Sequence, residues 1–288
     1  IVQSSDDAAN SLDVRSYYDS NTRRFLKTGH GASALAIRRA VWGPGIDSRE
    51  AAMQYVNDCI AERISAVEAA SVLDLGCGVG GSMLYLSGHS SLQKQPAYYG
   101  VTLSPVQAGI AEEVLSQGVE GPTWQILCGD YTLEEHWPSE QVNLAYAIES
   151  SIHVAAFDRA CAIAARRIAS GGEFVICDDF LVPDLARARD SRLLEAFRKG
   201  WYAYGLRSVQ QCSDLADAAG FDLVQNTDFS SYLELDRPRD LLARAFLGLF
   251  GWWPWRGPWL SNIYGGNALQ LLLKRGVLQY RFLVFRRR

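Results

Sequence analysis

Between residues 71 and 180 the chain alternates short apolar runs, typical of buried β-strands, with longer amphipathic segments, typical of helices. Strands that alternate with helices predict right-handed βαβ units, and therefore a mainly parallel sheet covered on both faces. The expected strands lie at 71–75, 97–103, 124–129, 142–148 and 172–179, with later ones at 221–230 and 279–286. The expected helices lie at 80–87, 105–117, 157–169 and 209–219. We therefore predict an α/β fold around one seven-stranded sheet.

The segments outside this alternation divide the chain into three parts. Residues 1–68 are polar and then helical, with Ser48 as the cap of an expected helix. Residues 69–235 contain the α/β core, interrupted by a charged helical insertion at about 181–206. Residues 236–288 form an aromatic-rich segment that ends in the last strand. We expect the parts outside the core to form a cap over it.

A loop rich in glycine, within "SVLDLGCGVGGSML", directly follows the first expected strand. Ligands of parallel sheets bind outside the carboxyl ends of the strands, and glycines let the backbone approach a ligand closely. The spacing Gly76-x-Gly78-x-x-Gly81 also fits the dinucleotide fingerprint. NAD and FAD are therefore the first alternatives for this loop, and a plain tight turn is another.

Two features disfavour a dinucleotide. Asp74 lies two residues before the first glycine, where a carboxylate would repel a pyrophosphate but attract a cation. The second expected strand ends in Val101-Thr102-Leu103, without the acid that would hold a ribose hydroxyl. S-adenosylmethionine (SAM) carries an ammonium and a sulfonium but no phosphate. It fits the loop better.

Composition and charge narrow the class of protein. The net charge of -4 and pI of about 5.6 argue against a nucleic-acid partner. The first residues of the sequence do not show the charged and then apolar pattern of a signal peptide, and no uncharged stretch approaches the roughly 20 residues of a membrane span. The six cysteines stand singly and the four histidines lack metal-ligand spacing. We expect a soluble, cytoplasmic protein without a metal or stable membrane insertion.

Several segments, in order, resemble those of class I SAM-dependent methyltransferases, beginning with "LDLGCGVGG". The others are "YYGVTLSPVQA" (98–108), "CGDYTLE" (128–134), "YAIESSIHV" (146–154), "IASGGEFVICDDF" (168–180) and "LADAAGFDLVQNTDFS" (215–230). The segment "YYGVTLSPVQA" is similar to that of prenyl and cyclopropane-synthase-like C-methyltransferases. The segment "YAIESSIHV" is similar to that of sterol C-methyltransferases. A looser match is "YYDSNTRRFL" at 17–26. The resemblance implies a Rossmann-like fold with helical cap segments, SAM as methyl donor and S-adenosylhomocysteine (SAH) as product.

The resemblance also implies which residues bind the cofactor. They are Asp74, Gly76, Gly78, Thr102, Leu103, Gln107, Asp130, Tyr131 and Glu149. The two glycines would pack against the methionine part of SAM, and Asp74 would hold its amino group. Residues 102, 103 and 107 would replace the missing ribose-binding acid, and Asp130 would accept from the adenine amino group. Each can instead be a capping or turn residue.

The acceptor is inferred from the aromatic residues, many of which lie outside the expected sheet. We expect residues 1–45, 181–206 and 236–275 to form its pocket, with the 17–26 helix as a lid that orders over SAM. Aromatic walls suit a prenylated hydrophobic metabolite and stabilise a carbocation. The expected substrate contacts are Tyr18, Phe25, Tyr202 and Tyr204. Methylation of a prenyl or terpenoid double bond is the expected activity.

Two residues are the candidates for catalysis. Glu149, at the end of the fourth expected strand, is the candidate base, and His153 would assist it. Glu149 can instead cap a helix, and His153 can be structural. The tryptophan-rich run at 252–255 can be a subunit interface, and we expect a homo-oligomer. A small-molecule O- or N-methyltransferase and a non-catalytic SAM-binding module remain alternatives.

Overall fold

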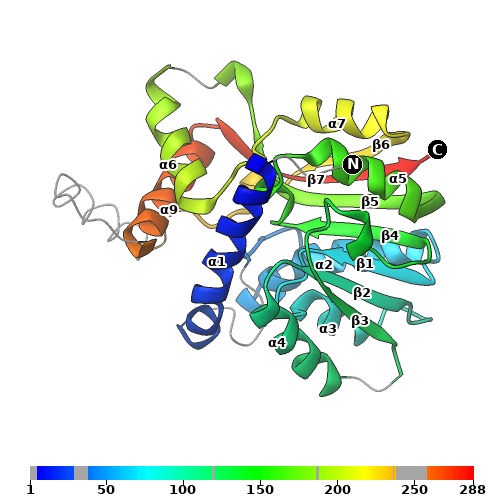
Figure 1. The fold of residues 1–288 in the computed structure, drawn as a ribbon. Coiled ribbons are helices and arrows are strands. Elements are labelled where there is room, and N and C mark those ends of the chain that lie inside the picture. The colour runs from blue at the N-terminus through cyan, green and yellow to red at the C-terminus, as the bar shows by residue number, and fades with distance from the viewer. Residues whose placement is uncertain (1–4, 29–37, 119–120, 186–187, 236, 238–257) are drawn as a thin grey trace.

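One seven-stranded sheet organises the protein (Figure 1). A computed structural model describes residues 5–28, 38–118, 121–185, 188–235, 237 and 258–288. The strands are β1 (Ser71–Leu75), β2 (Ala97–Thr102), β3 (Trp124–Cys128), β4 (Val142–Ile148), β5 (Ile168–Leu181), β6 (Phe221–Asp228) and β7 (Leu278–Arg287). Their order across the sheet is β3-β2-β1-β4-β5-β7-β6. The predicted seven-stranded α/β fold is confirmed.

The sheet is parallel except at β7, which pairs antiparallel with both β5 and β6. The other neighbouring pairs, from β3 through β5, are parallel. Consequently the carboxyl ends of β1, β2, β3 and β4 lie at the same edge of the sheet. Within β1, Asp74 is aligned with Gly100 of β2 and with Tyr146 of β4. This register places Asp74 one residue before the end of a buried strand.

Helices cover both faces of the sheet, and others lie beside the carboxyl ends of the parallel strands (Figure 1). The helices that pack on the faces are α2 (Arg49–Ala66), α3 (Gly81–Ser87), α4 (Pro105–Ser116), α5 (Phe157–Arg167) and α7 (Val209–Ala218). The helices beside the carboxyl ends are α1 (Ser5–Thr28), α6 (Ser191–Trp201) and α9 (Pro258–Lys274). Short 3-10 turns lie at Glu134–His136, Ser151–His153, Pro183–Leu185, Ala188–Asp190 and Ser230–Tyr232.

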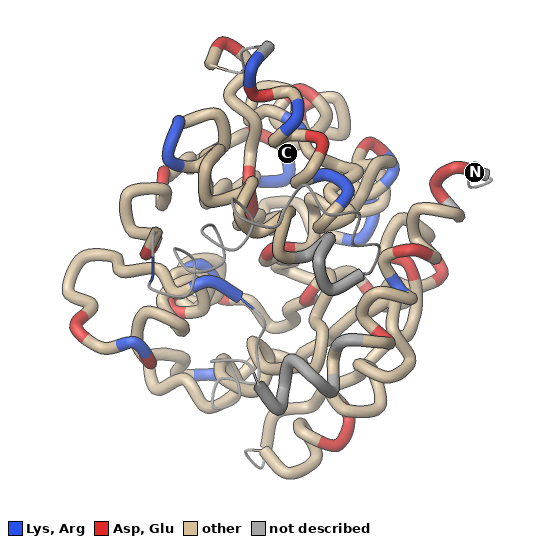
Figure 2. The backbone as a smooth tube through the Cα atoms, turned by 90° about the vertical axis from the view of Figure 1, so that its left-hand side faces the viewer, with Lys and Arg blue, Asp and Glu red and all other residues tan. Residues whose placement is uncertain are grey.

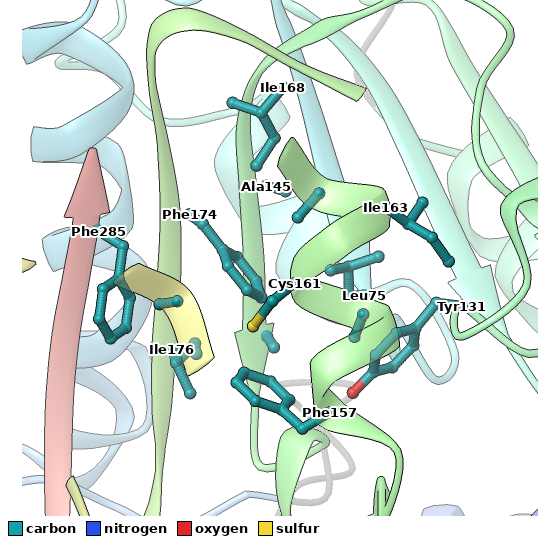
Figure 3. Packing of buried hydrophobic residues seen from close by; sticks show 14 of the residues in the cluster. Leu75, Tyr131, Ala145, Phe157, Cys161, Ile163, Ile168, Phe174, Ile176 and Phe285 are labelled. Carbon is teal, nitrogen blue, oxygen red and sulfur yellow. The ribbon is translucent and has the colours of Figure 1, made fainter. Parts of the chain in front are cut away.

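Two hydrophobic clusters sandwich the sheet, because successive side chains of a strand point to opposite faces. In β5, Phe174 and Ile176 pack into the cluster that α5 and α7 cover (Figure 3). Val175 and Cys177 of the same strand pack into the cluster that α2 and α3 cover. All four are buried. Because the sheet is buried on both faces, the sequences of its strands are continuous apolar runs.

Helix starts follow local capping chemistry. The Ser48 side chain accepts a hydrogen bond from the backbone N–H of Ala51, as the predicted cap should. Ser104 caps α4 in the same way, with Pro105 at its first position. Each described helix is too short or too polar to serve as a transmembrane span. On the face shown in Figure 2, acidic and basic residues are interspersed along the chain.

Candidate active site

A cavity at the carboxyl ends of β1 to β4 is lined by all nine residues that were predicted to bind a cofactor. The loop after β1 forms one wall, and Asp7, Ser11 and Tyr18 of α1 form part of the opposite one. We call it the glycine-loop cavity. The structure thus brings the predicted residues together, and their individual roles stay predictions.

The glycine loop turns sharply at the end of β1. Gly76 and Gly78 have φ angles of 94° and 56°, in the left-handed region that disfavours other residues. A Cβ atom on Gly76 would lie 2.5 Å from the Cβ atom of Ser150, so packing within the protein requires this glycine. A Cβ atom on Gly78 would meet no protein atom nearer than 4.0 Å. Gly78 therefore keeps space open on the cavity side.

Asp74 is a buried carboxyl group at the base of this loop, with a side chain facing the cavity. The hydroxyl of Tyr146 donates to its Oδ2 atom at 2.9 Å. Burial raises the pKa of Asp74 to about 7, against the opposing effects of the Tyr146 hydrogen bond and the positive charge of Arg38. A cationic ligand group beside Asp74 would favour the ionised form.

Arg38, which the sequence did not single out, also lines the glycine-loop cavity. Its guanidinium donates to Asn57 Oδ1 at 2.7 Å, Ser82 Oγ at 2.9 Å and Gln54 Oε1 at 2.7 Å. These acceptors are neutral, its Nε atom is buried with no partner among the described residues, and burial lowers its pKa. A partly buried cation whose described hydrogen-bond partners are all neutral is suited to binding a ligand carboxylate.

The far side of the cavity is tied to α1 through side chains after β2. Thr102 Oγ1 donates to Gln107 Oε1 at 2.9 Å, and Gln107 Nε2 donates to Thr22 Oγ1 of α1 at 3.2 Å. Leu103 lines the cavity between them in sequence. The oxygen of Thr102 and the backbone here are positioned to accept from ligand hydroxyls.

Asp130, after β3, also connects to α1. Its Oδ1 atom accepts from the backbone N–H and the hydroxyl of Thr132, both at 2.8 Å, and its Oδ2 atom accepts from Ser11 Oγ at 2.6 Å. The neighbouring Tyr131 is buried, with its carbonyl accepting from Trp137 Nε1. Helix α1 therefore covers the cavity where the predicted lid should lie, and lid movement stays a prediction.

A second cavity adjoins the first and lies under α1, α6 and α9. It is lined by Tyr17, Tyr18, Arg39, Glu149, Ile152, His153, Asp178, Asp179, Phe197, Trp201 and Leu269. We call it the cap cavity. Tyr18, Glu149 and His153 line both cavities. A group bound in one cavity can therefore approach a group bound in the other at these three side chains.

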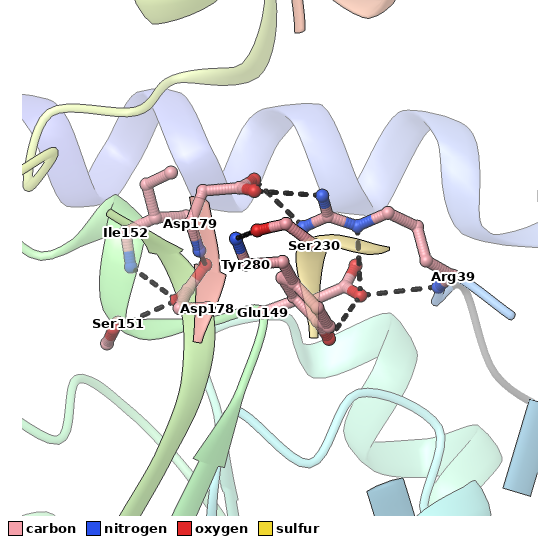
Figure 4. Close-up of polar contacts among 8 residues, drawn as sticks. All are labelled: Arg39, Glu149, Ser151, Ile152, Asp178, Asp179, Ser230 and Tyr280. Carbon is pink, nitrogen blue, oxygen red and sulfur yellow. Dashed lines mark hydrogen bonds and ion pairs between the residues drawn. The ribbon is translucent and has the colours of Figure 1, made fainter. Parts of the chain in front are cut away.

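Glu149 stands at the junction in a strained backbone conformation, with a φ angle of 50°. Its Oε1 atom accepts from the Arg39 backbone N–H at 3.2 Å, Arg39 Nε at 3.3 Å and the Tyr280 hydroxyl at 2.9 Å (Figure 4). Within the described ranges, no hydrogen bond to Oε2 is formed. Rather than capping a helix, Glu149 holds one oxygen in a fixed network and leaves the other for a ligand.

Arg39 links Glu149 to a pair of acids at the end of β5 (Figure 4). Its Nη1 and Nη2 atoms donate to Asp179 at 2.9 and 2.8 Å. Asp178 accepts from the Ser151 hydroxyl and the Ile152 backbone N–H, both at 2.9 Å. Burial and the nearby charge of Asp179 raise the pKa of Asp178 to about 7. In the described parts of the chain, these and other acids form no group suited to hold a metal ion.

His153 ends the 3-10 turn after Glu149 and is held in one orientation. Its Nδ1 atom lies 3.1 Å from the carbonyl oxygen of Tyr202, so Nδ1 carries the proton. Its Nε2 atom lies 3.1 Å from the Tyr18 hydroxyl, which therefore donates to it. Burial lowers the pKa of His153. The ring is neutral, and Tyr18 stands between its basic nitrogen and the cavities.

The predicted substrate residues lie in different places. Tyr18 lines both cavities, whereas Tyr202 and Tyr204 line neither. The ring of Tyr202 packs 5.3 Å from that of Tyr17, and the Tyr204 hydroxyl donates to Asp13 at 3.0 Å, so both contact α1. The side chain of Phe25 and the run 252–255 lie outside the described residues. Trp201, Phe197 and Leu269 line the cap cavity but were not predicted as site residues.

Comparison with known proteins identifies the core. Residues 73–176 match the family described as "Methyltransferase domain". The chain is 22% identical over 191 residues to 24-methylenesterol C-methyltransferase 2 of Arabidopsis thaliana, covering 65% of this chain and 51% of that protein. It is 29% identical over 198 residues to a probable chloroplastic tocopherol O-methyltransferase of Oryza sativa subsp. japonica, covering 64% and 52%. This chain thus spans about half the length of these curated relatives.

A solved structure extends the likeness beyond the core. Geranyl diphosphate methyltransferase in complex with geranyl diphosphate and sinefungin has a TM-score of 0.71 at 16% identity. The match covers 97% of this chain and 100% of that one. At this identity the likeness shows a shared fold.

Proposed function

The chain belongs to the class I SAM-dependent methyltransferases, and on this premise we propose that it methylates a carbon atom. The acceptor is the double bond of a prenyl or terpenoid group on a small hydrophobic metabolite. The reaction passes through a carbocation on the acceptor. The sterol C-methyltransferase relative and the geranyl diphosphate methyltransferase neighbour support carbon as the acceptor atom.

One observation carries the proposal: the two cavities share Glu149, whose Oε2 atom accepts no hydrogen bond from the described chain. The glycine-loop cavity has the charges that SAM needs, and the cap cavity has apolar and aromatic walls. A free carboxylate oxygen at their junction is suited to a reaction that creates and then removes positive charge.

The residues of the glycine-loop cavity fit SAM in charge. Arg38 would bind the carboxylate of its methionine part, and Asp74 would face the ammonium. Asp130 would accept from the adenine amino group, while Thr102 and Gln107 contact the ribose hydroxyls. When bound, SAM supplies a methyl group on a positively charged sulfur. The protein's task is then to position this group and exclude water.

In the cap cavity, Tyr18, Phe197 and Trp201 present the walls against which a prenyl chain would lie. As one carbon of the double bond gains the methyl group, its neighbour becomes cationic. Aromatic faces attract such a charge by about 0.5–2 kcal/mol each. Glu149 Oε2 then takes a proton from an adjacent carbon, which restores a double bond. Arg39 and Tyr280 keep the carboxylate in place throughout.

A second candidate is transfer to oxygen, which the tocopherol O-methyltransferase relative supports. The neutral His153 favours it, because a hydroxyl acceptor needs a base. Tyr18, however, occupies the Nε2 atom of His153. An oxygen acceptor would have to displace this hydroxyl or pass its proton through it. The carbon acceptor needs no such change.

The decisive experiment uses SAM with a labelled methyl group and a panel of prenylated metabolites. We expect the label on a carbon of the prenyl group, with every exchangeable O–H and N–H retained. Saturating the prenyl double bond should abolish turnover. Label on oxygen or nitrogen of every accepted substrate would contradict the proposal. Calorimetry should show binding of SAM and SAH but not of NAD.

A further inference from the structure

The cap cavity carries more negative than positive charge. Among its described lining residues, Glu149, Asp178 and Asp179 are acids, and Arg39 is the one permanent cation. His153 adds no positive charge, because burial lowers its pKa. An acceptor that enters this cavity therefore meets more carboxyl groups than cations, and Asp178, whose pKa is raised to about 7, carries part of a charge at neutral pH.

Arg39 is already committed to these acids. Its guanidinium bonds both oxygens of Asp179, and its Nε and backbone N–H bond Oε1 of Glu149. The guanidinium carbon also lies 4.2 Å from the centre of the Tyr280 ring. Arg39 is thus held from several sides and is not free to bind an incoming anion.

The remaining hydrogen-bonding capacity of the cavity suits an uncharged polar group. The phenolic oxygen of Tyr18 can accept a hydrogen bond, because its own proton points to His153. Trp201 contributes an apolar wall only, because its Nε1 atom is buried and the same edge of the ring lies beside Gly265 and Gly266 of α9. A hydroxyl or amide N–H group of an acceptor can donate to the Tyr18 oxygen.

Building on the proposed function, we propose that the cap cavity selects a prenylated acceptor whose polar end is uncharged and donates a hydrogen bond, and that it excludes prenyl diphosphates. The inference rests on the excess of carboxyl groups among the described lining residues, on Arg39 being already paired and on the accepting oxygen of Tyr18. This chain would share the fold of the geranyl diphosphate enzyme but not the charge of its acceptor.

The test compares ligands with one carbon skeleton and different ends. Farnesol, farnesyl acetate and farnesyl diphosphate are titrated into the SAH-loaded protein by calorimetry, the diphosphate with and without Mg²⁺. We expect the diphosphate to bind at least about a hundredfold more weakly than farnesol, because like charges would be brought together. The acetate, which lacks a donor, should bind about tenfold more weakly.

Tighter binding of the diphosphate than of farnesol, in either buffer, would overturn the inference. Equal binding of farnesol and its acetate would overturn the requirement for a donor. Binding of SAH is measured first on the same sample. Its failure would count against the proposed function, whereas SAH binding with a preference for diphosphate would count against this inference alone.

A charge-removing variant sharpens the result. Asp179→Asn removes one negative charge from the cavity and should reduce the preference for farnesol over the diphosphate by about tenfold. Asp184→Asn, at an exposed position outside both cavities, should leave the preference unchanged. Equal preferences in both variants would overturn the electrostatic cause. If Asp179→Asn does not fold, the ligand series on the unaltered protein still decides.

Discussion

Two adjacent residues, Arg38 and Arg39, line different cavities, and their side chains serve opposite purposes. Arg38 lines the glycine-loop cavity and donates only to neutral groups within the described chain, so its charge is available to a ligand. Arg39 lines the cap cavity and is paired with Asp179 and Glu149, so its charge is used within the protein. The positive charge in the glycine-loop cavity can therefore pair with a ligand, whereas the one in the cap cavity is already paired with acids of the protein.

The two regions also differ in how they are built. The glycine-loop cavity is formed by the loops that follow neighbouring parallel strands, and the backbone conformation of these loops largely determines its geometry. The polar network of the cap cavity joins Arg39, Glu149, Asp179 and Tyr280, which are far apart in the sequence. The first arrangement can serve any chemistry that uses the same cofactor. The second depends mainly on side chains and is where specificity for an acceptor can arise.

The largest effect should come from the residue that the two cavities share. Glu149→Gln keeps the shape of the side chain and removes its basicity. We expect turnover to fall by about 10²–10⁴, the usual contribution of a general base. SAM affinity should stay within about threefold, since Arg38 and Asp74 carry the charges that bind it. Turnover of labelled substrate and calorimetry measure the two quantities.

Glu140→Gln is the matched control, because Glu140 is exposed and lines neither cavity. It should leave both quantities unchanged. If Glu149→Gln kept full turnover, Glu149 would be a structural partner of Arg39 and not a base. A loss of SAM binding as large as the loss of turnover would assign Glu149 to the glycine-loop cavity alone.

The next largest effect is the loss of folding stability when either arginine is replaced. Arg39→Met leaves two largely buried carboxylates without their counter-ion and should reduce the free energy of unfolding by about 3 kcal/mol, the lower end for breaking a buried pair. Arg38→Met should cost less, because it also removes a buried charge that lacks a counter-ion. Urea unfolding of the SAM-free proteins measures both, and equal losses would contradict the comparison.

The sequence anticipated the glycine-loop cavity better than the cap cavity for a physical reason. Asp74 lies one residue before the end of β1, and Gly76 and Asp130 follow β1 and β3 within two residues. Predicting these strands therefore predicts the edge of the sheet at which the three residues lie. Their neighbours in space come from loops at that same edge. A motif of a few residues is therefore enough to predict where most of the glycine-loop cavity lies.

The cap cavity has no such local signal. Tyr280 contacts Glu149 because β7 lies between β5 and β6, whereas Arg39 contacts it from the segment before α2. Hydrophobic periodicity predicts neither the order and direction of strands nor such a long-range contact. Trp201 faces the cavity, whereas the adjacent Tyr202 packs against Tyr17. Counting aromatic residues could not separate these two roles. Arg38 was missed likewise, because its partners Gln54 and Ser82 lie on different helices.

A smaller effect tests whether the free charge of Arg38 serves a ligand. Arg38→Met should weaken SAM by about 1.5–3 kcal/mol, the scale of a hydrogen bond to a charged group. Decarboxylated SAM should bind the variant and the unaltered protein equally, because it lacks the group that Arg38 would contact. Asp130→Ala is the control: it should weaken both ligands alike, by about 1–3 kcal/mol. Equal losses for both ligands in Arg38→Met would remove Arg38 from the carboxylate site.

The smallest effect separates the cavities by pH, because each contains a buried aspartate whose pKa is raised to about 7. A carboxyl group with a raised pKa stabilises the folded state at low pH, and this contribution is lost as the pH rises through about 7. Binding of SAM has the opposite sign at Asp74, since its ammonium favours the ionised carboxylate. SAM should therefore bind about tenfold more tightly at pH 8 than at pH 6, while the SAM-free protein becomes less stable over the same window.

In Asp74→Asn the pH dependence of SAM binding should shrink, whereas Asp178→Asn, in the cap cavity, should retain it. Calorimetry at the two pH values measures this dependence. If Asp178→Asn reduced the pH dependence of SAM affinity and Asp74→Asn did not, the two cavities would not be electrostatically separate.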